Sequence, residues 1–149
     1  YTYGSGTAWS GFEKSPPLFA EIKRLNADLK KLEPWLAAAL PISQETVGHA
    51  KKGLRVSALW SGDMDALIVV IRNLDYETDR EENDFGKKPR FKTSPKEQTQ
   101  ITLHKPAWLV ASKATDVLND QPVPFRAEGE TLQLDIGKLE LGKIIVIGK

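Results

Sequence analysis

The side chains of this chain that could do chemistry are mostly carboxylates and lysines, and their spacing does not form a catalytic motif. Glycoside hydrolysis needs two carboxyl groups about 5–10 Å apart on either side of the scissile bond. The acidic residues here fall mostly in predicted turns or in the polar stretch 75–97. No two of them are predicted at facing strand ends beside an apolar pocket, so we assign no catalytic residue and expect no activity for this chain alone.

A fragment of a calcium-loop spacing occurs in the polar stretch. Asp79, Glu81 and Asn83 stand at alternate positions, as the first ligands of such a loop do. That loop also needs a glycine at its sixth position and a glutamate at its twelfth. These positions hold Asp84 and Arg90. The pattern therefore indicates a solvated loop, and we expect no metal site there.

The remaining signals for metals and cofactors are weaker. The chain has no cysteine, which excludes disulfides, thiol catalysis and zinc–thiolate sites. Its two histidines, His49 and His104, are far apart in sequence. The glycines at Gly4 and Gly6 lack the spacing and the preceding strand of a phosphate-binding loop. The sequence thus predicts neither a metal nor a cofactor.

Charge argues against polyanionic partners. There are 21 basic and 20 acidic residues, for a formal net charge of +1. The short basic run at 87–92 directly follows an acidic stretch that cancels most of its field. No apolar run approaches the roughly 20 residues that span a bilayer. We therefore expect neither nucleic acid nor a membrane as partner.

Four tryptophans raise the question of carbohydrate binding, because an exposed aromatic face can stack on a sugar ring. Trp60 and Trp108 fit strand alternation and are predicted to lie in the core, while Trp35 lies in a helical stripe. Trp9, in a Gly/Ser-rich aromatic segment, is the tryptophan predicted to be exposed. An alternative function is thus a carbohydrate-binding module. Its candidate sugar contacts are Trp9, Tyr1 and Tyr3.

The N-terminal third of the chain is predicted to contain a long amphipathic helix. Ser15 is a suitable N-cap, and Pro16 and Pro17 follow in the first turn. The apolar run continues past Pro34 to Leu40. A single helix cannot bury its own apolar face, so this face is predicted to pack on the sheets, on another domain, or on its own copy in a symmetric homodimer. The face consists of Leu18, Ile22, Leu25, Leu29 and Leu32.

The rest of the chain has the pattern of short strands. Residues 54–60 alternate, and 66–71 form an unbroken apolar run typical of a strand covered on both faces, so the two segments predict a hairpin. Further strands are predicted up to residue 147, including one opened by Trp108 and Val110. About seven or eight strands indicate an antiparallel β-sandwich with an N-terminal amphipathic helix. We assign 1–53 to the aromatic loop, helix and linker, and 54–149 to the sandwich.

Several of these segments resemble the C-terminal region of multidomain glycoside hydrolases that have a (β/α)8 catalytic barrel. Segment 22–36 resembles the I-x-x-L-N-x-x-L-x-x-L-x-P-x-L helix before the accessory domain, and 66–75 is similar to its central strand. Segment 114–124 resembles x-D-V-x-x-G-x-x-V, although Asn119 and Asp120 stand where glycine is common, and 132–147 is similar to the closing strands. The resemblance covers about 16–149, and the polar excursion at 75–97 is longer than usual.

This resemblance implies a non-catalytic accessory domain that packs on, and stabilises, the catalytic domain of the same polypeptide. The family's catalytic acid and nucleophile lie in the barrel, and no position here matches them. The resemblance also implies a secreted or periplasmic protein. The first residue is tyrosine and not methionine, which predicts a segment processed or excised from a longer chain.

Overall fold

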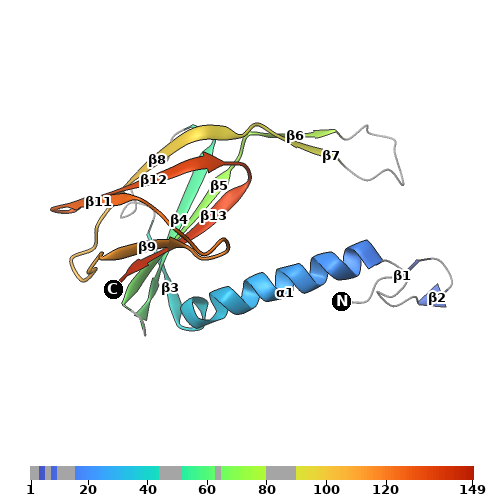
Figure 1. Cartoon of the computed structure of the whole chain (residues 1–149), viewed down its shortest axis with the longest axis horizontal. Helices are drawn as coiled ribbons and strands as arrows, with labels where there is room; N and C mark the ends of the chain where they lie inside the picture. Colours follow the sequence, from blue (N-terminus) through green and yellow to red (C-terminus); the bar gives the residue numbers. More distant parts are fainter. Residues whose placement is uncertain (1–3, 6–7, 10–15, 44–51, 63–64, 80–89) are drawn as a thin grey trace. The chain divides into compact units, whose positions relative to one another are not determined.

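The computed structural model describes residues 4–5, 8–9, 16–43, 52–62, 65–79 and 90–149. The chain divides into two compact units, Tyr1–Pro34 and Trp35–Lys149. The first contains a short hairpin of β1 (Gly4–Ser5) and β2 (Ala8–Trp9) and most of helix α1 (Pro16–Leu36). The second contains the sheets (Figure 1).

Helix α1 begins where the prolines predict and ends earlier than expected. Pro16 and Pro17 occupy its first positions, where a missing N–H leaves no hydrogen bond unmade. Pro34 lies inside the helix, which stops at Leu36 and does not reach Leu40. The predicted helical extension is wrong because residues 39–42 pair as an edge strand of a sheet, where Pro41 is tolerated.

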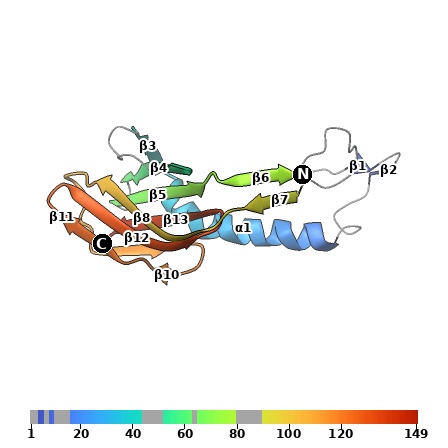
Figure 2. The same cartoon turned by 90° about the horizontal axis from the view of Figure 1, so that it is seen from above.

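The larger sheet has six antiparallel strands in the order β10-β9-β13-β5-β4-β3 (Figures 1 and 2). The predicted hairpin at its centre is confirmed, with Leu54 opposite Asn73 and Ser61 opposite Ala66. Both edge strands are short, and each contains a proline, Pro41 in β3 and Pro122 in β10. The strands are β3 (Ala39–Ile42), β4 (Leu54–Ser61), β5 (Ala66–Asn73), β9 (Lys113–Asp116), β10 (Gln121–Pro122) and β13 (Gly142–Gly148).

The smaller sheet has three antiparallel strands in the order β11-β12-β8. They are β8 (Lys96–His104), β11 (Phe125–Glu128) and β12 (Thr131–Leu139). A separate hairpin pairs β6 (Tyr76–Asp79) with β7 (Arg90–Thr93). Within the described residues, the two main sheets together hold nine strands, slightly more than predicted, because the edge strands β3 and β10 carry no clear alternation.

The core lies between the two sheets, and alternation along the strands explains it. β4 buries Leu54, Val56 and Ala58 while its intervening residues are more exposed, and β12 buries Leu132 and Leu134 in the same way. These inward side chains form one apolar cluster with residues from β5, β8 and β13. The predicted antiparallel β-sandwich with an N-terminal helix is therefore confirmed.

The central strand β5 is buried on both faces, as its unbroken apolar run predicts. Val69 and Ile71 face the core between the sheets. Ile68 lies on the opposite face and has no exposed surface, and its register partner Val146 is also buried. Side chains along the outer strands alternate between buried and exposed, whereas those along the central strand are buried almost continuously.

The segment after β8 differs from the prediction of a strand. Residues 105–112 form no strand but contain a turn at 107–108, where the Leu109 N–H donates to the Pro106 carbonyl at 3.0 Å. Leu109 is buried in the core, while Trp108 and Val110 on either side are exposed. The predicted strand is therefore wrong, and Leu109 is the residue of this segment that faces the core, not Trp108.

Candidate functional site

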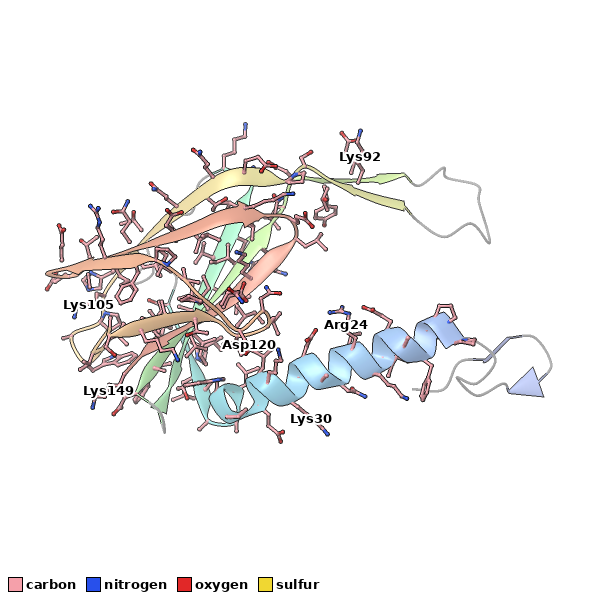
Figure 3. The ribbon with its side chains drawn as sticks, viewed as in Figure 1. Arg24, Lys30, Lys92, Lys105, Asp120 and Lys149 are labelled. Carbon is pink, nitrogen blue, oxygen red and sulfur yellow. The ribbon has the colours of Figure 1, made fainter. Side chains whose placement is uncertain are left out.

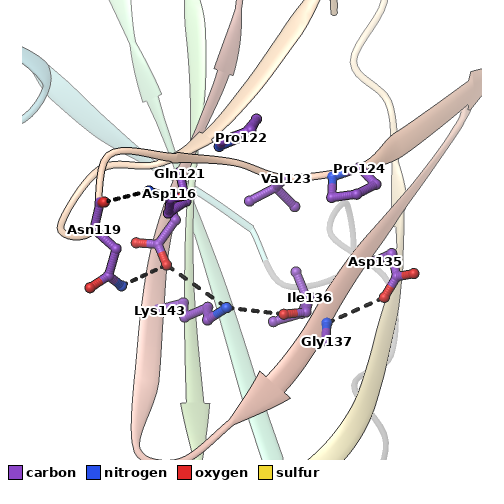
Figure 4. Close-up of a pocket in the computed structure, with 10 residues that line it drawn as sticks. All are labelled: Asp116, Asn119, Gln121, Pro122, Val123, Pro124, Asp135, Ile136, Gly137 and Lys143. Atoms are coloured by element: carbon purple, nitrogen blue, oxygen red, sulfur yellow. Dashed lines mark hydrogen bonds and ion pairs between the residues drawn. The ribbon is translucent and has the colours of Figure 1, made fainter.

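A pocket opens where the chain crosses from the larger sheet to the smaller one. β9 turns into β10, and residues 123–124 then carry the chain to β11 in the other sheet (Figure 4). Its volume of about 710 Å³ lies within the range of ligand pockets, roughly 300–1,000 Å³. We call it the Asp116–Lys143 pocket. It is lined by Asp116, Asn119, Gln121, Pro122, Val123, Pro124, Asp135, Ile136, Gly137 and Lys143.

Asp116 places a carboxylate at a core-facing position of β9. It stands opposite Ile145, and Ala114, two residues earlier on the same face, belongs to the apolar cluster. The residue is 2% exposed. Its Oδ2 accepts a hydrogen bond of 2.9 Å from Asn119 Nδ2, whereas Oδ1 is buried without a hydrogen-bond partner. Burial of a carboxylate is unfavourable unless it is paired and hydrogen-bonded, so its neighbours matter.

Lys143 is that neighbour and ties the two sheets together. It lies in β13, and its Nζ is 3.9 Å from Asp116 Oδ2. The same ammonium donates a 3.0 Å hydrogen bond to the carbonyl of Ile136 in β12 of the smaller sheet. Figure 4 shows the lysine between these two acceptors. The pair is therefore close to charge-balanced and held in place from both sheets.

The opposite wall of the pocket is an irregular part of β12. Its register against β8 shifts between Asp135 and Gly137. Gly137 has a φ of 63°, which side chains rarely adopt, and its N–H donates to Asp135 Oδ1 at 3.2 Å. The Asp135 N–H in turn donates to the Pro124 carbonyl at 2.9 Å, which fixes the crossover segment against this strand. Bulges of this kind often re-aim side chains beside binding sites.

The chemistry that this pocket offers is hydrogen bonding. Carboxylate and amide oxygens accept, and the ammonium and amide nitrogens donate. Two prolines, a valine and an isoleucine supply apolar walls. Among the described residues, no three side chains of the metal-binding types gather in one place, here or elsewhere.

A second surface feature is a pair of tryptophans. Trp60 in β4 and Trp108 have ring centroids 5.6 Å apart with a 42° angle between the planes. They are 36% and 40% exposed, so the prediction that both lie in the core is wrong. Trp60 sits near the end of β4, opposite the exposed Leu40 of the edge strand, where the sandwich no longer covers an inward position.

The helix carries a third feature, a partly uncovered apolar face. Of the residues predicted to form it, Leu32 is 5% exposed, whereas Leu25 and Leu29 are 47% and 59% exposed. Leu18 and Ile22 are half-buried. The labelled Arg24 and Lys30 project from different sides of α1 (Figure 3). No helix in the described part of the chain is long and apolar enough to cross a membrane.

Other residues singled out from the sequence are placed only in part. Tyr1, Tyr3 and His49 lie outside the described residues, as do Glu81 and Asn83 of the calcium-like spacing and the first half of the basic run, 87–89. Trp9 belongs to β2, but its side chain is not among those described. Sugar contact by Trp9, Tyr1 and Tyr3 therefore stays a prediction.

The Asp116–Lys143 pocket was not assigned from the sequence, although two signals were available. Asp116 is two residues after Ala114, so the two side chains share one face of a strand. A buried Ala114 therefore predicts that the Asp116 carboxylate also faces the core. Lys143 opens an apolar strand that runs to Ile147. Pairing of β9 with β13 brings these two charges together, and nothing local in the sequence specifies that pairing.

Comparison with known proteins finds similarity at the level of structure. No family model and no curated protein matches this chain. Among solved structures, it is similar to alpha-L-fucosidase isoenzyme 2 from Paenibacillus thiaminolyticus, with a TM-score of 0.52 and 13% identity. The match covers 95% of this chain and 20% of the fucosidase chain, so this chain spans about a fifth of that protein's length. At this identity the likeness concerns the fold alone.

Proposed function

We propose that this chain is a non-catalytic accessory domain of a glycoside hydrolase and that it packs on the catalytic domain of the same polypeptide. The observation that carries the proposal is the shared fold: helix and sandwich together match one part of a longer chain that is an alpha-L-fucosidase. A match of 95% of this chain to 20% of that chain supports a role as one region of a larger enzyme.

The uncovered face of α1 supports the same role. Leu25 and Leu29 are large apolar side chains that remain about half exposed in this chain. Burying a leucine fully is worth roughly 1.5–3 kcal/mol. A catalytic domain that covers this face would gain that stabilisation and would fix the direction of the helix. In this role the fragment contributes stability and orientation, and the chemistry belongs to the catalytic domain.

The test compares the isolated chain with the longer polypeptide that includes the catalytic domain. We expect the double substitution Leu25→Asp/Leu29→Asp to lower the melting temperature of the longer protein by roughly 5 °C or more, because two buried leucines become charged. In the isolated chain the shift should stay below about 2 °C. Ala20→Asp/Ala27→Asp, at exposed positions on the opposite side of α1, introduces two aspartates with the same change of net charge and serves as the matched control.

Equal shifts for the two double variants in the longer polypeptide would contradict the proposal. Light scattering on the isolated chain addresses the homodimer alternative. A dimer that Leu25→Asp/Leu29→Asp dissociates, and that the control leaves intact, would mean that a second copy covers this face. A monomer is the expected result.

A further inference from the structure

We propose that the Asp116–Lys143 pocket is a binding site for a single neutral sugar residue. This inference depends on the pocket itself and not on the accessory-domain proposal. It concerns residues at the sheet crossover, none of which belongs to the apolar face of α1. Two charges, the hydrogen-bonding groups around them and the apolar walls of the pocket support this assignment.

The two charges occupy positions where apolar side chains would serve folding better. Asp116 stands in register with Ile145, and Lys143 stands opposite Ile71, both members of the core cluster. Replacing a buried ion pair with apolar residues of similar size is often neutral or stabilising. A carboxylate with an unpartnered oxygen and an ammonium at such positions therefore indicate a role other than stability.

The charge arrangement selects a neutral ligand. An anion drawn to Lys143 would also meet the carboxylates of Asp116 and Asp135, and a metal ion drawn to those carboxylates would meet the ammonium 3.9 Å from Asp116. A hydroxyl group has neither difficulty, because it both donates and accepts. The site thus favours a ligand that carries several hydroxyls and no charge.

The rim supplies matching partners. Lys143 has three N–H donors, of which one bonds to Ile136 and another points toward Asp116 at long range. Asn119 gives its Nδ2 to Asp116 and so keeps its amide oxygen as an acceptor. Gln121 is exposed and makes only a 3.4 Å hydrogen bond to the Asn119 carbonyl, so its amide can turn to a ligand at small cost.

The walls fit the other surface of a pyranose. The faces of a sugar ring are largely C–H groups, which pack on apolar side chains without loss of hydrogen bonds. Pro122, Val123, Pro124 and Ile136 line the pocket beside the polar rim. Asp116 itself is a positioning residue here, because its buried carboxylate holds Asn119 and Lys143 in place (Figure 4).

The experiment is a titration of the isotopically labelled chain, followed by backbone amide chemical shifts. The probes are L-fucose, D-galactose, D-glucose, D-mannose and N-acetyl-D-glucosamine, with inorganic phosphate and calcium chloride as charged probes. For a ligand of about a dozen heavy atoms we expect a dissociation constant of roughly 1–10 mM. At least one sugar should shift the amides of Gln121, Gly137 and Lys143 saturably.

Two variants and a matched control separate binding from folding. Gln121→Ala removes an exposed rim group and should weaken binding about fivefold with an unchanged spectrum elsewhere. Lys143→Met should weaken it at least about tenfold. Lys138→Met makes the same change at an exposed position of β12 that does not line the pocket, and it should leave the affinity unchanged. Retained affinity in Gln121→Ala would by itself overturn the assignment, so the test stays decisive even if Lys143→Met fails to fold.

Other outcomes are equally decisive. No saturable shift with any of the five sugars at 50-fold the expected constant would overturn the proposal. So would phosphate or calcium shifting the same amides more strongly, since either would mean a charged ligand. Sugar binding that Trp9→Ala abolishes and Lys143→Met preserves would move the site to the N-terminal aromatics. None of these results bears on the melting of the helix variants, so the two proposals can fail separately.

Discussion

The sandwich and the helix use the same residue type in opposite ways. Leu132 and Leu134 in β12 have no exposed surface, whereas Leu25 and Leu29 in α1 are about half exposed. Both sets follow the period of their element. Periodicity therefore identifies which side chains share a face, while the presence of an opposing surface within the same chain decides whether that face is buried. In the sandwich the second sheet provides that surface.

The largest expected effect is the loss of stability when a buried leucine of the sandwich is truncated, compared with truncation of an exposed leucine of the helix. Leu134→Ala should lower the free energy of unfolding of the isolated chain by about 2–5 kcal/mol, because it leaves a cavity between two sheets. Leu29→Ala in the same chain should change it by less than about 0.5 kcal/mol. Urea denaturation of both variants measures the difference. Similar losses for the two would mean that the helix leucine is buried in solution.

A smaller effect is expected at the polar end of the sandwich. Asp116→Ala should cost about 1–3 kcal/mol, because it removes the acceptor of Asn119 and the counter-charge of Lys143. Asp135→Ala, at an exposed carboxylate of the same pocket, should stay within about 0.5 kcal/mol. The same urea titration checks both. A stabilised Asp116→Ala variant would show that the buried carboxylate is a net cost to folding.

The next smaller effect on stability is expected from a substitution at Gly137, in the wall of the pocket. Gly137→Ala is expected to cost about 1 kcal/mol, since a side chain is disfavoured at its φ of 63°. A Cβ at this position would meet nothing within 4 Å, so the cost is conformational and not steric. Thermal unfolding should therefore move by about 2–4 °C. A change much larger than this would point to a collapse of the bulge.

The smallest effect concerns pH at the exposed face of α1. Arg24 donates to Glu21 and also pairs with Asp28, and the hydrogen bond from Arg24 lowers the pKa of the Glu21 carboxyl. A carboxyl whose pKa is lower when folded contributes stability above its ordinary pKa and loses it as the pH falls through the folded value. Helical circular dichroism should thus weaken slightly in acid, and Glu21→Gln should remove that part of the dependence.

The fold class followed from the sequence because alternation and helical spacing are strong where one face is buried. The central hairpin and the closing strands were predicted from such patterns and are confirmed. The end of the helix was missed because the alanines around Ala39 suit a helix, and only pairing with β4 makes them a strand. Trp60 and Trp108 were misplaced because alternation does not reveal where a sheet ends.

The Asp116–Lys143 pocket was beyond sequence reasoning for a related cause. Its residues come from three stretches of the sequence, 116–124, 135–137 and Lys143, and the strand order of the larger sheet places β9 beside β13, which brings the two charges together. The irregularity at Gly137 depends on register against β8. The sequence shows the residue types that line the pocket, but which of them come together depends on the pairing of strands far apart in the sequence.

The two prolines at the margins of the larger sheet have a consequence for assembly. Pro41 and Pro122 lie in the outermost strands, β3 and β10, and neither has an N–H to offer an approaching strand. Edge strands with open donors are the usual route by which sheets join across molecules and aggregate. Both margins here are short and interrupted, so growth of the sheet from chain to chain is opposed at each end. Association through the larger sheet is thereby directed to side-chain surfaces.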